Sequence, residues 1–119
     1  MRGLTILVAT DDTARFRAAL ATAAAAAALG ARARVFLHEA AADLLVARPD
    51  ADAARLAAAG VPTQEQLLEI ARESGVALIV CQTGLARAGL SMETLSAGAE
   101  AGGLVSLLGT LGEDRLLAF

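Results

Sequence analysis

VALIVCQTG, the stretch from Val76 to Gly84, decides the fold prediction. Its first five residues are aliphatic, which is typical of a β-strand that is covered on both faces. The chain's single cysteine, Cys81, follows at once, and the polar residues Gln82 and Thr83 then begin a loop. Because open α/β sheets bind ligands beyond the carboxyl ends of their strands, Cys81 stands where a functional side chain is expected.

The same alternation of apolar runs and capped segments extends along the whole chain. Further strands are predicted at residues 4–9, 32–38 and 115–119, with a brief one between 98 and 102. Helices are predicted from the TDDT segment (10–13) to Leu29, over 40–47, from Thr63 to Gly75, from Ser91 to Gly98 and over 104–112, with a further turn or two at 52–60. Strands that alternate with helices predict a three-layer α/β/α domain with a mainly parallel five-stranded sheet. Residues 1–119 are expected to form this single domain.

Three helices carry specific local signals. Thr63 and Gln66 have the spacing of a capping box, in which two side chains satisfy backbone N–H groups reciprocally. Asp11 and Asp12 are interpreted as an N-cap with a first-turn charge. In the helix predicted at 104–112, we expect four leucines to face the core: Leu104, Leu107, Leu108 and Leu111.

Composition excludes several classes of protein. All ten basic residues are arginines, they are scattered, the net charge is −3, and there are three Phe and no Tyr or Trp, so we expect no nucleic-acid partner. The absence of lysine excludes a P-loop and Schiff-base chemistry. A single Cys and a single His exclude the usual Cys/His zinc patterns and an intrachain disulfide, and we expect no metal and no cofactor.

MRGLTILVAT begins as a strand rather than a signal peptide, and no apolar stretch is long enough for a membrane span. We therefore expect a cytoplasmic protein that makes no membrane contact.

Polar side chains gather at the predicted carboxyl edge of the sheet. They are Asp11, Asp12, His38, Cys81, Gln82, Thr83, Arg87 and Glu100. No glycine-rich turn follows the first strand and no GxSxG occurs, which excludes a dinucleotide site and a serine hydrolase of that type. His38 is expected to be an ordinary polar residue at a strand end, and Arg87 a solvated arginine, although both could supply positive charge to a thiolate at Cys81.

The C-terminal part of the chain contains a series of short motifs. A strand ending in cysteine is followed by a Gly89–Leu90 step, a G-x-E-x-G-G turn at 98–103, a hydrophobic helix and a final D-x-x-L-x-F strand at 114–119. In these features residues 75–119 resemble the C-terminal half of the DsrE/DsrF-like sulfur-relay family. The N-terminal half matches more loosely, through ILVAT, an alanine-rich helix and LGARARVFLH. After the second strand, where relatives often have a Gly-containing polar turn, this chain has His38, Glu39 and alanines.

The resemblance implies a fold, a chemistry and an assembly. It implies a DsrEFH-like α/β/α domain that forms trimers or hexamers and carries sulfur as a persulfide on the residue that matches Cys81. Protein sulfur donors and acceptors would then be the partners. His38, Gln82, Thr83, Arg87 and Glu100 are the candidate supporting or substrate-binding residues around that cysteine.

Three hypotheses are open. In the first, Cys81 precedes a predicted helical turn whose N–H groups favour a thiolate, so it is expected to be partly accessible, and the resemblance implies that this thiolate is the sulfur carrier. A buried, structural cysteine would instead fit a non-catalytic module that binds a small ligand or a protein. A thiol peroxidase is the weakest hypothesis, because the chain has no second cysteine to resolve an oxidised one. Independently of the family, a mean hydropathy of +0.58 in a 12.0 kDa chain favours a homo-oligomer.

Overall fold

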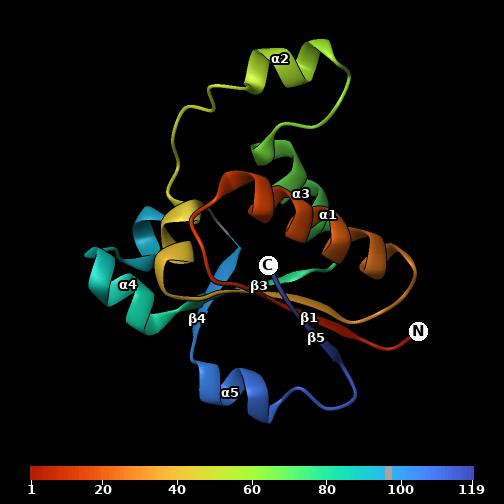
Figure 1. The fold of residues 1–119 in the computed structure, drawn as a ribbon, viewed down its shortest axis with the longest axis vertical. Coiled ribbons are helices and arrows are strands. Elements are labelled where there is room, and N and C mark those ends of the chain that lie inside the picture. The colour runs from red at the N-terminus through yellow and green to blue at the C-terminus, as the bar shows by residue number, and fades with distance from the viewer. Residues whose placement is uncertain (96–97) are drawn as a thin grey trace.

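The structure is a computed structural model that describes residues 1–95 and 98–119. In this part of the chain, one five-stranded sheet has the order β4-β3-β2-β1-β5 (Figure 1). The strands are β1 (Leu4–Val8), β2 (Ala33–Leu37), β3 (Ala77–Cys81), β4 (Ala99–Gly102) and β5 (Arg115–Ala118). All neighbouring pairs are parallel, so the predicted α/β class and parallel sheet are confirmed.

Two long helices, α1 (Thr13–Ala28) and α3 (Gln64–Glu73), cover one face of the sheet (Figure 1). The α1 side chains Phe16 and Leu20 are fully buried there. The other buried residues of α1 are alanines, whose small size lets the helix backbone lie close to the strands. Two predicted caps are confirmed: the Asp12 side chain accepts hydrogen bonds from the N–H groups of Ala14 and Arg15, and Thr63 and Gln66 form the capping box. The first-turn charge predicted with the Asp12 cap is wrong, because Asp12 is itself the N-cap, Asp11 precedes it, and the first turn of α1 holds no acidic residue.

On the opposite face lies the short helix α5 (Leu104–Gly109), and this side of the sheet is called the α5 face below. Leu107 is buried against Phe36 and Cys81. The expectation that Leu104 and Leu108 also face the core is wrong, because both are exposed. The fourth leucine, Leu111, is half-buried but lies beyond the helix, which ends at Gly109 rather than at the predicted Gly112. A helix of this length meets the sheet along a single line of contact, so its other leucines remain at the surface.

Shorter helical segments connect these layers. They are η1 (Glu39–Leu45), a 3-10 helix, α2 (Ala53–Ala58), α4 (Gln82–Ala88) and η2 (Met92–Thr94), also 3-10. The helix predicted from Ser91 to Gly98 is wrong in its extent, because η2 is a single turn without a Ser91 side-chain cap; residues 96–97 lie outside the described part. No helix among the described residues is sufficiently long and apolar to traverse a membrane.

A buried polar network fixes the end of α5 to the sheet. Asp114 accepts hydrogen bonds from Arg32 (2.7 Å) and from the hydroxyl of Thr5 (2.9 Å). The buried Arg34 side chain donates to Thr5 (3.0 Å), to the hydroxyl of Thr110 (2.8 Å) and to a carbonyl in the last turn of α5. This network holds α5 in place over Cys81 on the α5 face.

The same network sets the charge state of Asp114. Burial alone would raise the pKa of the Asp114 carboxyl, but hydrogen bonds from Arg32 and Thr5 and the charges of Arg32 and Arg34 outweigh it, so the pKa lies below its usual value. Burial, together with the nearby charge of Arg32, lowers the pKa of Arg34. The folded chain therefore stabilises the ionised form of the Asp114 side chain.

Candidate functional site

Cys81 lies at the junction of β3 and α4. It is the last residue of the strand and the N-cap of the helix, and its Sγ accepts a hydrogen bond from the backbone N–H of Gly84 at 3.3 Å. Its side chain points to the α5 face, where it contacts the cluster formed with Phe36 and Leu107. Cys81 is only 4% exposed, so the expectation of a partly accessible thiol is wrong for this single chain.

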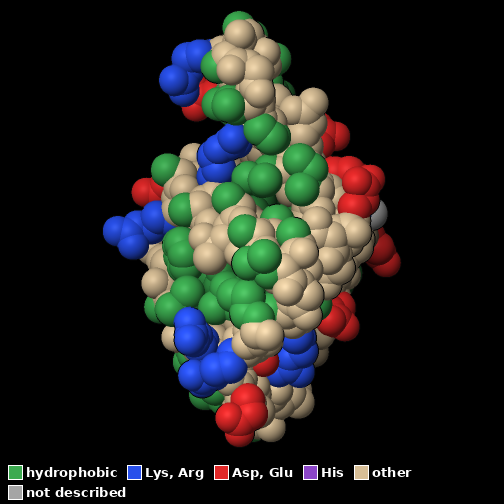
Figure 2. Space-filling view, turned by 90° about the vertical axis from the view of Figure 1, so that its right-hand side faces the viewer, with side chains coloured by type: hydrophobic (Ala, Val, Ile, Leu, Met, Phe, Trp, Pro, Cys, Tyr) green, Lys and Arg blue, Asp and Glu red, His purple; other side chains and the backbone are tan. Residues whose placement is uncertain are grey.

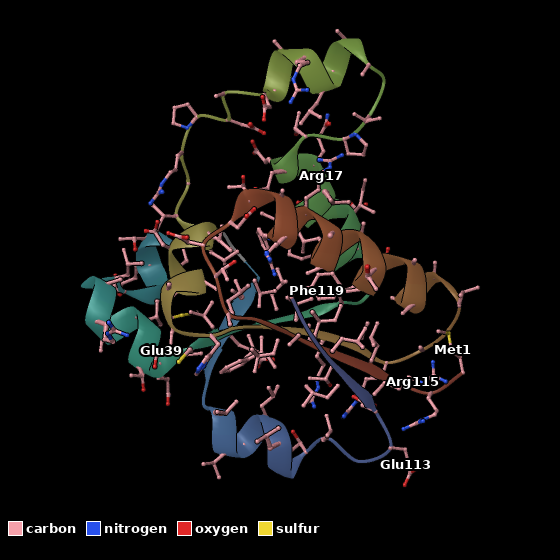
Figure 3. All side chains as sticks on the ribbon, in the orientation of Figure 1. Met1, Arg17, Glu39, Glu113, Arg115 and Phe119 are labelled. Carbon is pink, nitrogen blue, oxygen red and sulfur yellow. The ribbon has the colours of Figure 1, made fainter. Side chains whose placement is uncertain are left out.

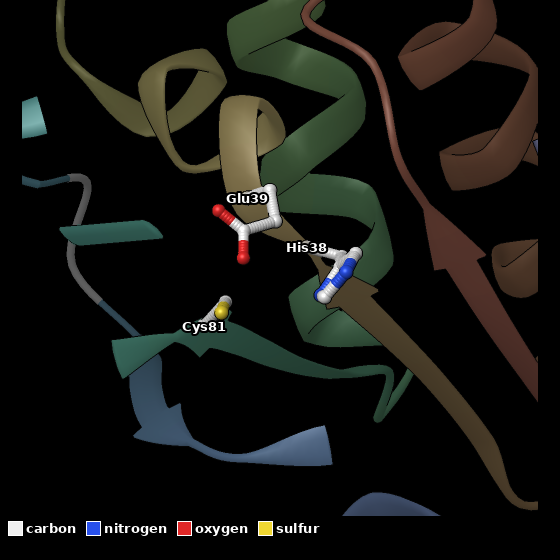
Figure 4. Close-up of side chains that lie close together, drawn as sticks. All are labelled: His38, Glu39 and Cys81. Carbon is white, nitrogen blue, oxygen red and sulfur yellow. The ribbon is translucent and has the colours of Figure 1, made fainter. Parts of the chain in front are cut away.

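The loop that follows β2 brings two further side chains to Cys81. Leu37 pairs with Val80, so the residues that follow them, His38 just after β2 and Cys81 at the end of β3, come level at the carboxyl edge of the sheet. A ring nitrogen of His38, a carboxylate oxygen of Glu39 and the Sγ of Cys81 all lie within 4.8 Å of one another (Figure 4). We call these three residues the Cys81 cluster. Figure 3 shows Glu39 beside α4, at the end of the sheet remote from Met1.

The backbone around Glu39 is unusual for a residue with a side chain. Glu39 has a φ of +52°, in the left-handed region that costs a non-glycine residue free energy. Helix α4 lies directly against this turn, because a Cβ added to Gly84 would stand 2.5 Å from the Glu39 carbonyl oxygen. Gly84 therefore permits the contact that brings the N–H donor of α4 to Cys81 and the carboxylate of Glu39 to the same place.

The His38 side chain is held by the stacking of its ring, while its backbone N–H donates a hydrogen bond to the Val8 carbonyl at 2.9 Å. The imidazole stacks on Phe36, with 5.9 Å between ring centroids and 29° between the planes. Its Nδ1 atom is buried and has no hydrogen-bond partner among the described residues. Burying a polar atom without a partner is unfavourable, so this nitrogen is available to a proton, a ligand or a metal ion.

Arg87 joins the Cys81 cluster through Glu39. Its guanidinium donates to Glu39 Oε2 at 2.9 Å, and most of the arginine side chain is exposed. Arg87 is thus a largely solvated arginine, as the sequence predicts, and the carboxylate of Glu39 binds its positive charge. Arg87 offsets the negative charge of Glu39, which would otherwise disfavour a thiolate nearby.

The other candidates do not join the cluster. Gln82 and Thr83 are exposed in the first turn of α4, and within residues 1–95 and 98–119 neither makes a hydrogen bond to the Cys81 cluster. Glu100 is level with Ile79 in the sheet, two positions before Gly102, which is level with Cys81, and its side chain is exposed. Asp11 is exposed beside the α1 cap.

Sequence reasoning missed Glu39 as a functional candidate. One signal was present, since Glu39 directly follows His38 in a loop already expected at the carboxyl edge. Its position beside Cys81 depends on β2 and β3 being neighbours in this register, which the local sequence does not specify. A cysteine, a histidine and a glutamate together form a donor set that suits a metal ion as well as thiol chemistry.

Comparison with known proteins identifies the chain's family. The model of the DsrE/DsrF-like family matches residues 3–119. The chain belongs to the DsrE/DsrF-like family. This DsrE/DsrF-like chain is similar to the ychN protein from E. coli, whose crystal structure has a TM-score of 0.69 at 26% identity and covers 98% of this chain and 99% of that one.

A second solved structure shares the fold alone. It is a protein of unknown function, MTH1491 from Methanobacterium thermoautotrophicum, with a TM-score of 0.73 at 15% identity, covering 99% of this chain and 98% of that one. We found no curated protein that matches the sequence. Membership of the DsrE/DsrF-like family gives the chain a sulfur-relay-type fold, with Cys81 at the carboxyl edge of its sheet.

Proposed function

We propose that the chain carries sulfane sulfur as a persulfide on Cys81, between a donor and an acceptor protein. The observation that carries the proposal is the hydrogen bond from the Gly84 N–H to Cys81 Sγ, at the tip of a strand in a sulfur-relay-type fold. A backbone donor aimed at the sulfur stabilises an anion there, and the thiolate is the nucleophile of such chemistry.

The proposed sulfur transfer conserves atoms and electrons and needs no cofactor. The Cys81 thiolate attacks the outer sulfur of a donor persulfide, a new S–S bond forms on Cys81, and the S–S bond of the donor breaks to release the donor thiolate. A thiolate of the acceptor then attacks the outer sulfur of the Cys81 persulfide, and Cys81 leaves as a thiolate. In this proposal His38 takes the thiol proton at the start, a role supported by a His38 ring nitrogen that lies within 4.8 Å of Cys81 Sγ.

The burial of Cys81 favours the alternative, a non-catalytic binding module of the same fold. In that case the cysteine is a packing residue beneath α5, as its contact with Phe36 and Leu107 allows. For the carrier proposal, the side chains over Cys81 must move, or a donor must displace them, before the sulfur is reached.

Mass spectrometry of the folded protein distinguishes the two functions. The reduced protein, kept in a chelator, is incubated with inorganic polysulfide and its intact mass is measured after a short reaction. We expect the mass to rise by one sulfur atom in the wild type and to stay unchanged in Cys81→Ser, with the sulfur removed again by a small thiol. Sulfur uptake that requires denaturant would overturn the carrier proposal and support the binding module.

A further inference from the structure

The Cys81 cluster combines three kinds of metal donor. Cysteine offers a sulfur, histidine a ring nitrogen and glutamate a carboxylate oxygen, and the three donor atoms all lie within 4.8 Å of one another. We infer that His38, Glu39 and Cys81 form a binding site for a divalent zinc-class metal ion. The inference goes beyond the proposed function and does not depend on it, because a metal binds or fails to bind whether or not Cys81 accepts sulfur.

The state of His38 is the first argument for a ligand. Its Nδ1 atom is buried and without a hydrogen-bond partner among the described residues, while the ring is fixed by stacking on Phe36. A neutral imidazole nitrogen with an unused lone pair, held in one orientation, is the commonest metal donor in proteins. Because a ring nitrogen of His38 lies within 4.8 Å of Cys81 Sγ and of a Glu39 carboxylate oxygen, an ion bound between the three residues has an imidazole donor within reach.

The backbone of Glu39 is the second argument. The left-handed φ of +52° directs Glu39 toward Cys81 from a turn whose neighbour, His38, already points there. Sparsely populated conformations in non-glycine residues concentrate at functional sites, where the surrounding structure maintains them. Here α4 packs against the Glu39 carbonyl through Gly84, and Arg87 binds one carboxylate oxygen, Oε2. The other oxygen, Oε1, is the one left for a metal ion.

The distances fit an ion after a small adjustment. Zinc bonds of about 2.3 Å to sulfur and 2.0–2.2 Å to nitrogen and oxygen place tetrahedral ligands roughly 3.5 Å from each other. Donors that are up to 4.8 Å apart reach this spacing by movements of about 1 Å. The glutamate side chain, with three rotatable bonds and a partly exposed end, supplies most of that movement.

The donor set also selects the class of metal. A thiolate with an imidazole and a carboxylate suits Zn²⁺ and its neighbours among the first-row metals, and disfavours Mg²⁺ and Ca²⁺, which take oxygen ligands. Three protein ligands leave a fourth position for water or a small anion, as in open zinc sites. Binding converts the Cys81 thiol to a metal-bound thiolate and releases one proton to solvent.

Cobalt(II) is the probe for the test, because a Co²⁺–thiolate bond gives an intense charge-transfer absorption in the near ultraviolet. The reduced full chain is titrated with Co²⁺, and Zn²⁺ is then added to displace it. The variants are Cys81→Ser, His38→Ala and Glu39→Gln, and the matched control is Glu93→Gln, which removes an exposed carboxylate outside the Cys81 cluster. Circular dichroism of each variant checks that the fold is retained.

We expect saturation at one Co²⁺ per chain, displacement by Zn²⁺, and an unchanged affinity in Glu93→Gln. The thiolate band should vanish in Cys81→Ser. His38→Ala and Glu39→Gln should each weaken binding by at least roughly 10- to 100-fold, the range caused even by loss of a residue that only supports a ligand. The site is disproved if the wild type shows no thiolate band, or if folded His38→Ala and Glu39→Gln bind Co²⁺ as tightly as the control. Should His38→Ala fail to fold, Glu39→Gln against Glu93→Gln decides the question alone.

Discussion

At the scale of single residues, the site depends on a glutamate in a conformation that glycine adopts more easily. Glu39 is held at φ +52° between the end of β2 and the start of η1. We expect Glu39→Gly to be about 1 kcal/mol more stable than Glu39→Ala, because a Cβ in the left-handed region costs about 1–2 kcal/mol. Both variants lack the carboxylate, so their difference isolates the backbone effect. Urea denaturation of the two proteins measures it.

The comparison also says why a glutamate is present. If Glu39→Gly is more stable than the wild type, the side chain is retained at a cost to stability, which is typical of a functional residue. Equal stability of Glu39→Gly and Glu39→Ala would mean that the turn relaxes, and that the left-handed backbone does not constrain the Cys81 cluster.

The Cys81 cluster was predictable only in part. The strand-tip position of Cys81 follows from a continuous aliphatic run that ends in a polar turn, which is a local signal. The approach of Glu39 to Cys81 follows from the parallel pairing of β2 with β3, and no local signal carries that information. Burial of the thiol also depends on where α5 packs, and α5 lies more than 20 residues further along the chain.

At the scale of elements, Asp114 is the residue that attaches the α5 end of the chain to the sheet. Its side chain is buried and binds Arg32 and Thr5 together, close to Arg34. We expect Asp114→Asn to lower the free energy of unfolding by about 3 kcal/mol, since it leaves the buried Arg34 without its anionic neighbour. The matched control is Asp43→Asn, whose ion pair with Arg48 is exposed and should contribute less than about 1 kcal/mol. Equal effects of the two substitutions would contradict this role.

The lowered pKa of Asp114 predicts how stability depends on pH. A carboxyl whose pKa is lower in the folded chain than in the unfolded chain stabilises the fold fully above the unfolded value of about 3.9. That stabilisation is lost as the pH falls from there through the folded value. The urea midpoint of unfolding is measured at a series of pH values from 6 downward, in steps of about one pH unit. It should decline more steeply in the wild type than in Asp114→Asn. Parallel curves would show that Asp114 binds its proton equally in both states.

Another prediction concerns the close approach of Gly84, in helix α4, to the backbone of Glu39. A methyl group at Gly84 would lie 2.5 Å from a backbone carbonyl oxygen, which cannot swing away as a side chain can. We expect Gly84→Ala to destabilise the protein by about 1–3 kcal/mol, although alanine favours a helix. Gly109→Ala is the control, because a Cβ there has open space in α5 and should stabilise by about 0.5–1 kcal/mol. Thermal or urea unfolding of both variants provides the comparison.

Elements were predictable to the extent that their signals are local. The Thr63–Gln66 capping box and the aliphatic run of β1 each specify an element without help from the rest of the chain. The α5 leucines show the limit: their spacing correctly predicts a helix, but not which of them the sheet covers. The burial of Arg34 was not predictable either. Its partners Thr110 and Leu107 are more than 70 residues away along the chain, and a buried arginine in a strand has no local sequence signature.

At the scale of the whole molecule, the two faces of the sheet are covered unequally. Helices α1 and α3 close one face, whereas the α5 face carries a single short helix in the described part of the chain. Val105 is 88% exposed on α5, with Leu104 and Leu108 near it. Leu116 on β5, level with Thr5, lies on the same face and is also exposed. Figure 2 shows further apolar side chains on the side of the molecule that carries the N-terminus. Met1 and Leu29 are exposed and line an open hollow.

The exposed apolar side chains of the α5 face lead us to propose that the chain forms a homo-oligomer through this face. They are Leu104, Val105, Leu108 and Leu116. Several large apolar side chains together are unusual on the surface of a monomer and tend to mark an interface. Light scattering after size exclusion at micromolar concentration should give three or six times the 12.0 kDa mass of one chain. Val105→Asp places a charge in the expected interface and should shift the mass toward 12.0 kDa, because an unpaired charge there is desolvated. Leu29→Asp, at the hollow that Met1 and Leu29 line, is the control and should leave the assembly intact. Dissociation by Leu29→Asp and not by Val105→Asp would assign the interface to the other side, and a wild-type mass near 12.0 kDa would refute the oligomer altogether.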